Sequence, residues 1–174
     1  MKRVGTASRQ LNYGKESPVA DEKDGPTLDP ETERQVAVDL FNHVWTLLET
    51  EGRTPEQDDR MVHAVHASRH HWGQVGDATN LARGEWQCSR VYSVLGRAEP
   101  ALHHSRRCLE ICEANDIGDF DLAFAYEALA RASAVAGDSS ESLRCAELAR
   151  EAGERISEDE DRELLLQDLA TLTT

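Results

Sequence analysis

Apolar residues recur three and four positions apart along most of the chain after residue 29, which is the spacing of amphipathic helices that bury one face. The first such stretch predicts a helix that begins at Asp29-Pro30 and ends near Gly52. Asp29 suits the N-cap position and Pro30 suits the first turn. The apolar positions of this helix are Val36, Leu40, Val44, Leu47 and Leu48.

A second helix is predicted from Thr54-Pro55 to Gly73. Thr54 and Gln57 have the spacing of a capping box, in which each side chain binds the backbone N–H of the other residue. One face of this helix is expected to be buried, and it carries Met61, Ala64, Val65, Ser68 and Trp72. A polar loop, GQVGD, follows.

The rest of the chain predicts five further helices, at about 79–95, 98–114, 119–136, 139–155 and 157–172. Gly96 and Gly137 mark two of the helix ends. Asp119 is expected to open the helix at 119–136, and the expected N-caps of the last two helices are Asp138 and Ser157. No segment shows the alternation of apolar and polar residues that is typical of strands. The expected fold class is therefore all-α, with about seven helices.

The segment 83–150 contains two similar halves at a constant offset of 41 residues. Gly96 and Gly137 are separated by this offset, and so are Cys108 and Ala149. A fixed period of this length is typical of stacked helical hairpins.

Residues 83–150 resemble tetratricopeptide-like (TPR-like) repeats of the type whose period is near forty residues. The resemblance rests on the small or apolar pairs Cys88-Ser89 and Leu129-Ala130 and on the turn glycines Gly96 and Gly137. Tyr92 and Ala101 also fit the repeat pattern. It implies a superhelix of stacked antiparallel hairpins that binds a peptide or protein without catalysis.

The resemblance and the helix pattern together predict one helical domain over residues 29–174. Its expected parts are hairpins at 29–73, 79–114 and 119–155 and a terminal helix at 157–172. Residues 1–28 lack apolar periodicity, so we expect them to form a disordered arm.

Charge and composition restrict the classes of partner. The 174-residue chain has a formal net charge of −14, which disfavours nucleic acid and anionic membrane surfaces. No apolar run approaches the ~20 residues of a bilayer span. No apolar segment follows the basic start MKRVGTASRQ, so a signal peptide is not expected. The four cysteines form no CxxC pair, which favours reduced thiols in the cytoplasm: Cys88, Cys108, Cys112 and Cys145.

In TPR-like repeats the first helix of each hairpin lines a concave groove, so the resemblance points to a binding face. Three pairs of residues opposite the expected core side share the 41-residue offset. They are Arg83 and Phe124, Trp86 and Glu127, and Arg90 and Arg131, with Asn42 on the corresponding side of the first helix.

Arginine forks pair with carboxylates, and aromatic rings add apolar contact. We therefore expect a protein or peptide partner that presents an acidic motif or a C-terminal carboxylate. An alternative stays open, in which the rings pack in the core and the arginines are solvated or paired with Glu127 and Glu85.

Six of the seven histidines lie between residues 63 and 104. His66 and His70 are four residues apart on one helix, a spacing from which two imidazoles can bind one divalent transition metal. Packing between hairpins could add His104 as a third ligand, and the other candidates are His103, Cys108 and Glu85. Two further interpretations stay open: ordinary hydrogen bonding, or a packing interface that responds to pH near 6.5.

Two hypotheses for the function follow. The first is a non-catalytic binding scaffold without a cofactor, and the alternative is a small metal-binding protein or metal-dependent enzyme. No GxSxG elbow, phosphate loop or dinucleotide fingerprint is present in the sequence. Association into a homodimer through an end helix is a further expectation.

Overall fold

The computed structural model describes residues 28–172, and within that range all regular structure is helical. It contains seven helices: α1 (Pro30–Leu48), α2 (Pro55–Val75), α3 (Ala78–Val94), α4 (Ala98–Ala114), α5 (Asp119–Val135), α6 (Ser139–Gly153) and α7 (Asp159–Ala170). The all-α prediction is confirmed. The arm expected over residues 1–28 lies, apart from Leu28, outside the described residues.

Three helix starts follow the capping chemistry expected from the sequence. The Asp29 carboxylate accepts hydrogen bonds from the backbone N–H groups of α1. Thr54 and Gln57 form both bonds of the capping box at the start of α2. Asp138 accepts from the backbone N–H of Glu141 at 3.0 Å. Local side-chain chemistry is thus sufficient to set these three boundaries.

One expected cap is wrong, because its side chain has another partner. Asp119 is the first residue of α5, as expected, and its φ is +53°. Its carboxylate accepts from the backbone N–H and the hydroxyl of Ser157, at 3.2 and 2.9 Å. Ser157 therefore does not cap α7, which begins at Asp159 without a side-chain cap. The two polar residues join the starts of α5 and α7.

The second helix also ends later than expected. It continues through Gly73 to Val75, and the N–H of Gly76 binds the carbonyl of Trp72. A single glycine in a last turn weakens a helix without ending it.

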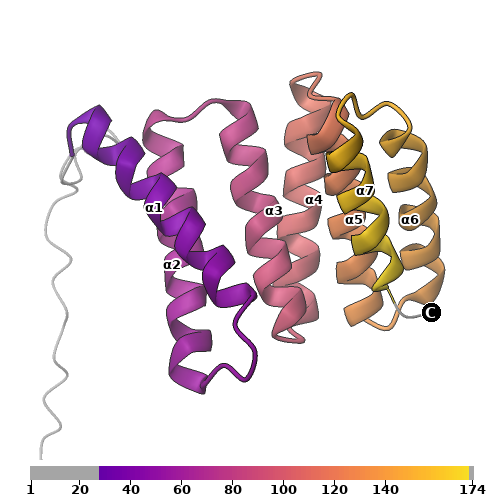
Figure 1. Cartoon of the computed structure of the whole chain (residues 1–174), viewed down its shortest axis with the longest axis horizontal. Helices are drawn as coiled ribbons and strands as arrows, with labels where there is room; N and C mark the ends of the chain where they lie inside the picture. The colour runs from indigo at the N-terminus through magenta and orange to yellow at the C-terminus, as the bar shows by residue number, and fades with distance from the viewer. Residues whose placement is uncertain (1–27, 173–174) are drawn as a thin grey trace, which may run out of the picture.

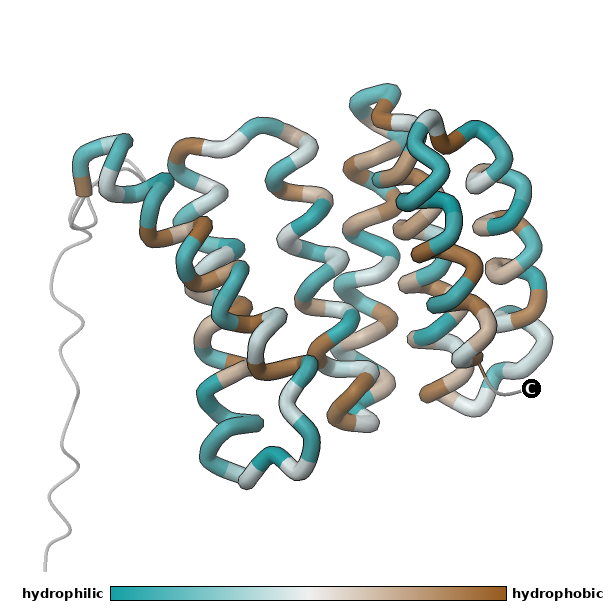
Figure 2. The backbone as a smooth tube through the Cα atoms, viewed as in Figure 1, coloured by the Kyte–Doolittle hydropathy of each residue, from teal (hydrophilic) through white to brown (hydrophobic). Residues whose placement is uncertain are grey.

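The helices pack as three consecutive pairs, α1 with α2, α3 with α4, and α5 with α6 (Figure 1). Contacts of α3 with α2 and of α5 with α4 join each pair to the next. Helix α7 packs on α5 and α6, and lies in front of α5 in Figure 1. Apolar and polar segments alternate along each helix (Figure 2). None of the described helices combines the length and apolarity that a membrane crossing requires.

The turn after α3 and the turn after α5 have the same geometry, 41 residues apart. Gly96 and Gly137 have φ of +67° and +78°. The backbone N–H of Arg97 donates to the carbonyl of Tyr92 at 2.9 Å. The backbone N–H of Asp138 donates to the carbonyl of Ser133 at the same distance. Both turns thus end their helix with a left-handed glycine and a hydrogen bond from a backbone N–H to the carbonyl five residues earlier. The sequence period is therefore a period of the backbone as well.

The core consists largely of small side chains, which lets helices approach closely. Cys88, Ala101, Cys112, Ala125 and Ala130 are fully buried. Helix α7 lies close to α6 at Gly153, where a Cβ atom would lie 2.5 Å from Cδ2 of Leu165. Leu165 and Leu169 are the buried side chains of α7.

Candidate functional site

Four charged side chains converge beneath α7, from three different helices. Arg90 of α3 forms an ion pair with Asp168 of α7. Arg131 of α5 donates to Glu127 on its own helix at 2.7 Å and to the backbone carbonyl of Asp168 at 2.9 Å. Arg90 also lies 3.6 Å from the Glu127 carboxylate. Two arginines and two carboxylates therefore form one connected network, which we call the arginine network.

Glu127 lies at the bottom of the arginine network, with 1% of its surface exposed. Burial raises the pKa of Glu127, and the positive charges of Arg90 and Arg131 only partly offset that effect. A buried charge is tolerated only while its partners remain in place. The network therefore depends on all of its members.

The 41-residue period explains why these arginines share a surface. Arg90 and Arg131 occupy equivalent positions of the two sequence copies. Because α3 and α5 pack together, equivalent positions on them face the same side of the molecule. The sequence prediction that these two arginines lie on one face agrees with the structure.

The two aromatic residues predicted for this face are buried. Trp86 packs edge-on against Phe124, with ring centroids 5.4 Å apart. The Trp86 ring also packs against Trp45 of α1, with ring centroids 5.1 Å apart. Phe124 is 1% exposed and Trp86 is 9% exposed. The indole Nε1 of Trp86 is buried and has no hydrogen-bond partner among residues 28–172. One hydrogen-bond donor beside the arginine network is therefore unused.

A cleft of about 440 Å³ opens between α1, α3 and α7, next to the arginine network. Its apolar walls include Val94 and Leu164, which are 48% and 45% exposed. The full lining is Trp45, Leu48, Glu49, Trp86, Arg90, Val94, Leu164 and Asp168.

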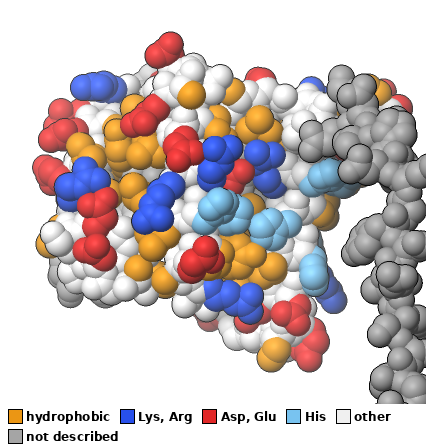
Figure 3. Space-filling model, turned by 180° about the vertical axis from the view of Figure 1, so that it is seen from behind, with side chains coloured by type: hydrophobic (Ala, Val, Ile, Leu, Met, Phe, Trp, Pro, Cys, Tyr) orange, Lys and Arg blue, Asp and Glu red, His pale blue; other side chains and the backbone are white. Residues whose placement is uncertain are grey.

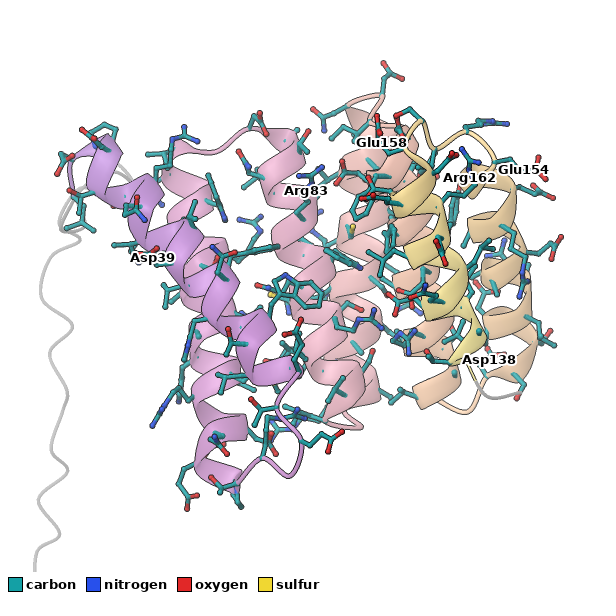
Figure 4. All side chains as sticks on the ribbon, viewed as in Figure 1. Asp39, Arg83, Asp138, Glu154, Glu158 and Arg162 are labelled. Atoms are coloured by element: carbon teal, nitrogen blue, oxygen red, sulfur yellow. The ribbon has the colours of Figure 1, made fainter. Side chains whose placement is uncertain are left out.

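The remaining two residues predicted for the groove lie apart from the arginine network. Arg83 binds both oxygens of Asp121 on α5, at 2.7 and 3.0 Å, and points from α3 towards α5 (Figure 4). Its guanidinium lies 5.6 Å from the Phe120 ring centroid. Asn42 is exposed on α1. The seven predicted residues thus do not form one open surface, because α7 covers part of it.

Sequence reasoning missed Asp168, which is the centre of the arginine network. The available signal was the spacing of Leu165, Asp168 and Leu169 on α7. It places the carboxylate on the same side of the helix as the two buried leucines.

A second group of polar side chains lies where α2, α3 and α4 meet. His66, Cys88 and His104 each place one donor atom so that all three atoms lie within 4.8 Å of one another. The predicted convergence of His66 and His104 is therefore present. The third predicted ligand, His70, is outside this group, and its ring packs against His71 with centroids 5.5 Å apart.

Two hydrogen bonds hold the histidine rings of this second group. Glu85 binds Nδ1 of His104 at 2.6 Å, and Arg69 donates to the same carboxylate at 2.9 Å. The hydroxyl of Tyr92 lies 2.7 Å from Nε2 of His66. The Tyr92 and His104 rings are stacked, with centroids 5.7 Å apart and planes within 5°.

Burial and charged neighbours together set the ionisation of Glu85 and Cys88. Burial alone would raise the pKa of Glu85, but the hydrogen bond from His104 and the charge of Arg69 lower it overall. Burial, followed by the Glu85 charge, raises the pKa of the Cys88 thiol. Without a bound ion, Cys88 is thus a protonated thiol at neutral pH and a poor nucleophile.

Comparisons of the chain with protein families, with curated proteins and with solved structures give no match. The class of protein is therefore defined by the fold alone, as an all-α stack of helical hairpins.

Proposed function

We propose that the protein is a non-catalytic scaffold of TPR-like repeats that binds an acidic amphipathic helix of a partner protein. The binding face is the surface of α3 and α5 that carries Arg90 and Arg131. Helix α7 occupies this face in the structure, and the partner helix takes its place.

The observation that carries the proposal is the position of Asp168 between Arg90 and Arg131. Two arginines from equivalent repeat positions contact one residue of an amphipathic helix. The same helix buries Leu165 and Leu169 against the scaffold. Helix α7 thus has the chemistry expected of a ligand for this face, with two leucines and a carboxylate on one side.

Helix α7 has features of a replaceable occupant. It is 12 residues long and lacks a side-chain N-cap, and an isolated helix of that length is marginal in water. Leu164 and Leu166 remain 45% and 51% exposed. The contacts that hold it are therefore concentrated at Leu165, Asp168 and Leu169.

The cleft beside α7 gives a partner helix an advantage over α7. A larger apolar side chain at the position of Leu164 would fill the space between Trp45, Leu48 and Val94. This added contact supplies differential affinity, without which one helix cannot displace another.

The four cysteines are unpaired and buried. Free buried thiols fit a reducing compartment, so we infer a cytoplasmic location.

The test uses a fluorescent peptide of residues 157–172 added to the full chain. In the wild type the tethered α7 competes at an effective concentration in the mM range, so micromolar peptide should not bind. Asp168→Arg places a third positive charge against Arg90 and Arg131 and should release α7. We expect this variant to bind the peptide at least tenfold more tightly than the wild type, in a fluorescence anisotropy titration.

Glu163→Arg is the matched control, because Glu163 lies on the exposed side of the same helix. It makes the same charge change and should leave peptide binding at the wild-type level. Leu169→Asp releases α7 by a second route, through the loss of an apolar contact. If hydrogen exchange shows α7 released in either variant and the peptide still does not bind, the groove is not a helix-binding site. Dimers that form by exchange of α7 between copies, detected by sedimentation, would support the proposal, since a second chain then supplies the helix.

A further inference from the structure

The second group, formed by His66, Cys88 and His104, lies away from the arginine network. Its residues belong to α2, α3 and α4 and are separated by at least 16 positions in the sequence. Figure 3 shows histidine side chains gathered on the face opposite the one drawn in front in Figure 1, among charged residues of both signs. This group and the α7 groove can therefore be tested independently.

The chemistry of the three side chains suits one class of ion. Two imidazoles and a thiolate are the donors that Zn²⁺ accepts in proteins, and three protein ligands leave a fourth position for water. Zinc–ligand distances of about 2.0–2.3 Å place neighbouring donors roughly 3.5 Å apart. The donor atoms lie within 4.8 Å of one another. Side-chain rotations that move each donor atom by about 1 Å bring neighbouring donors to the spacing that zinc requires.

Glu85 provides a separate observation that points to a metal. It binds Nδ1 of His104, which leaves Nε2 of that ring as the donor atom, and Arg69 holds the carboxylate in turn. A carboxylate on the second nitrogen of a histidine is the usual partner of metal-binding imidazoles, because it fixes the tautomer and orients the ring. Both Glu85 and Cys88 are buried, whereas His104 is only partly so. An ion would thus meet the histidines first and the sulfur last.

We propose that His66, Cys88 and His104 bind one zinc ion per chain, with Glu85 as the positioning residue for His104. On binding, the sulfur–hydrogen bond of Cys88 breaks, the sulfur lone pair forms a bond to zinc, and the proton passes to solvent. No electron is transferred in this step. The ion ties α2, α3 and α4 together, so it stabilises the junction between the first two hairpins.

The experiment uses the untagged full chain after removal of metal with a chelator. We expect Zn²⁺ to bind with a stoichiometry of one per chain in a competition titration with a chromophoric chelator. Zn²⁺ should also raise the Tm, because an ion that binds only the folded state stabilises it. Co²⁺ added in place of Zn²⁺ should give a thiolate-to-cobalt charge-transfer absorption that reports the sulfur ligand directly.

Matched variants identify the ligands. Cys88→Ser should abolish the charge-transfer absorption, and Cys108→Ser, at another buried cysteine, should not. His104→Gln should abolish stoichiometric zinc binding, and His103→Gln, at the adjacent position, should leave it unchanged. Glu85→Gln keeps all three ligands and should weaken zinc affinity by about 10–100-fold, as expected for a positioning residue.

His66→Gln keeps the test decisive if Cys88→Ser fails to fold, because His66 is not part of the apolar core. The proposal is overturned if the folded wild type takes up less than a tenth of an equivalent of zinc. It is also overturned if the cobalt absorption persists in Cys88→Ser, or if His66→Gln binds zinc like the wild type.

Discussion

Arg90 of α3 and Arg131 of α5 contact the same residue, Asp168 of α7, although they are 41 positions apart in the sequence. This shared contact shows that the two halves of the 41-residue period present equivalent positions on one surface. It also makes α7 the element that neutralises that surface. The arginine network, the α6–α7 contact and the two glycine turns each lead to a prediction that can be measured.

Asp168→Ala removes the carboxylate partner of Arg90 but keeps the backbone carbonyl that Arg131 uses. Because hydrogen bonds to charged groups contribute about 1.5–3 kcal/mol, we expect the free energy of unfolding to fall by about that amount. Urea denaturation measures the change. Glu163→Ala, on the exposed side of α7, is the control and should shift stability by less than about 0.5 kcal/mol. Equal stabilities of the two variants would contradict the prediction.

Glu127→Gln tests the burial of a charge among Arg90, Arg131 and Asp168. The pKa of Glu127 is raised in the folded state, so the folded chain holds this proton more tightly than the unfolded chain. The tighter proton binding by Glu127 stabilises the folded chain fully at pH values below 4.5, the pKa of this carboxyl in the unfolded chain. This stabilisation is lost as the pH rises through the higher pKa of the folded chain.

We therefore expect the stability of the wild type, relative to Glu127→Gln, to decrease as pH rises from about 4.5 towards neutrality. Urea denaturation of both proteins across this range gives the difference. Taking the difference between the two proteins removes the contribution of carboxylates that do not interact with Glu127. A difference that increases with pH would show that the arginines dominate and that the pKa is lowered.

Gly153→Ala tests the close approach of α6 and α7. The added Cβ would lie 2.5 Å from Cδ2 of the buried Leu165, so the Leu165 side chain must move and loosen the packing of α7. We expect faster hydrogen exchange in α7, whereas the amides of α5 stay protected. Gly73→Ala is the control, since its Cβ meets only Arg69 Nη1 at 3.4 Å. That change should stabilise α2 by up to about 1 kcal/mol through helix propensity.

Gly96→Ala and Gly137→Ala test whether the two turns are equivalent. Both glycines have positive φ, and a Cβ at either would have no atom within 4 Å, so conformational strain is the main cost. A residue with a Cβ loses about 1–2 kcal/mol in this conformation. The two variants should therefore show similar losses in thermal unfolding. A large loss at one position and none at the other would mean that the turns differ in solution.

The helices and their turns were predictable because their causes lie within a few residues. Asp29, Thr54 and Asp138 cap their helices as expected, and the left-handed glycines end α3 and α5. Ser157 shows where this reasoning stops. It has the right chemistry for a cap, but it binds Asp119 across 38 positions of sequence.

The candidate sites were predictable only in part. The period brought Arg90 and Arg131 together, and the histidine pattern pointed to His66 and His104. The helical wheel could not show that Trp86 and Phe124 are buried, because α3 and α5 are covered on more than one side. A residue opposite the main apolar stripe is therefore not necessarily exposed.

The sequence by itself determined the seven helices, the two equivalent turns and the alignment of the two arginines. The physical reason is that capping, backbone preference and periodicity act over one or two helical turns. Only the tertiary structure decided that α7 covers the arginines with Asp168 and that Cys88 lies beside the histidines. Those contacts depend on how the helices pack, which is the sum of many weak interactions between residues far apart in the chain.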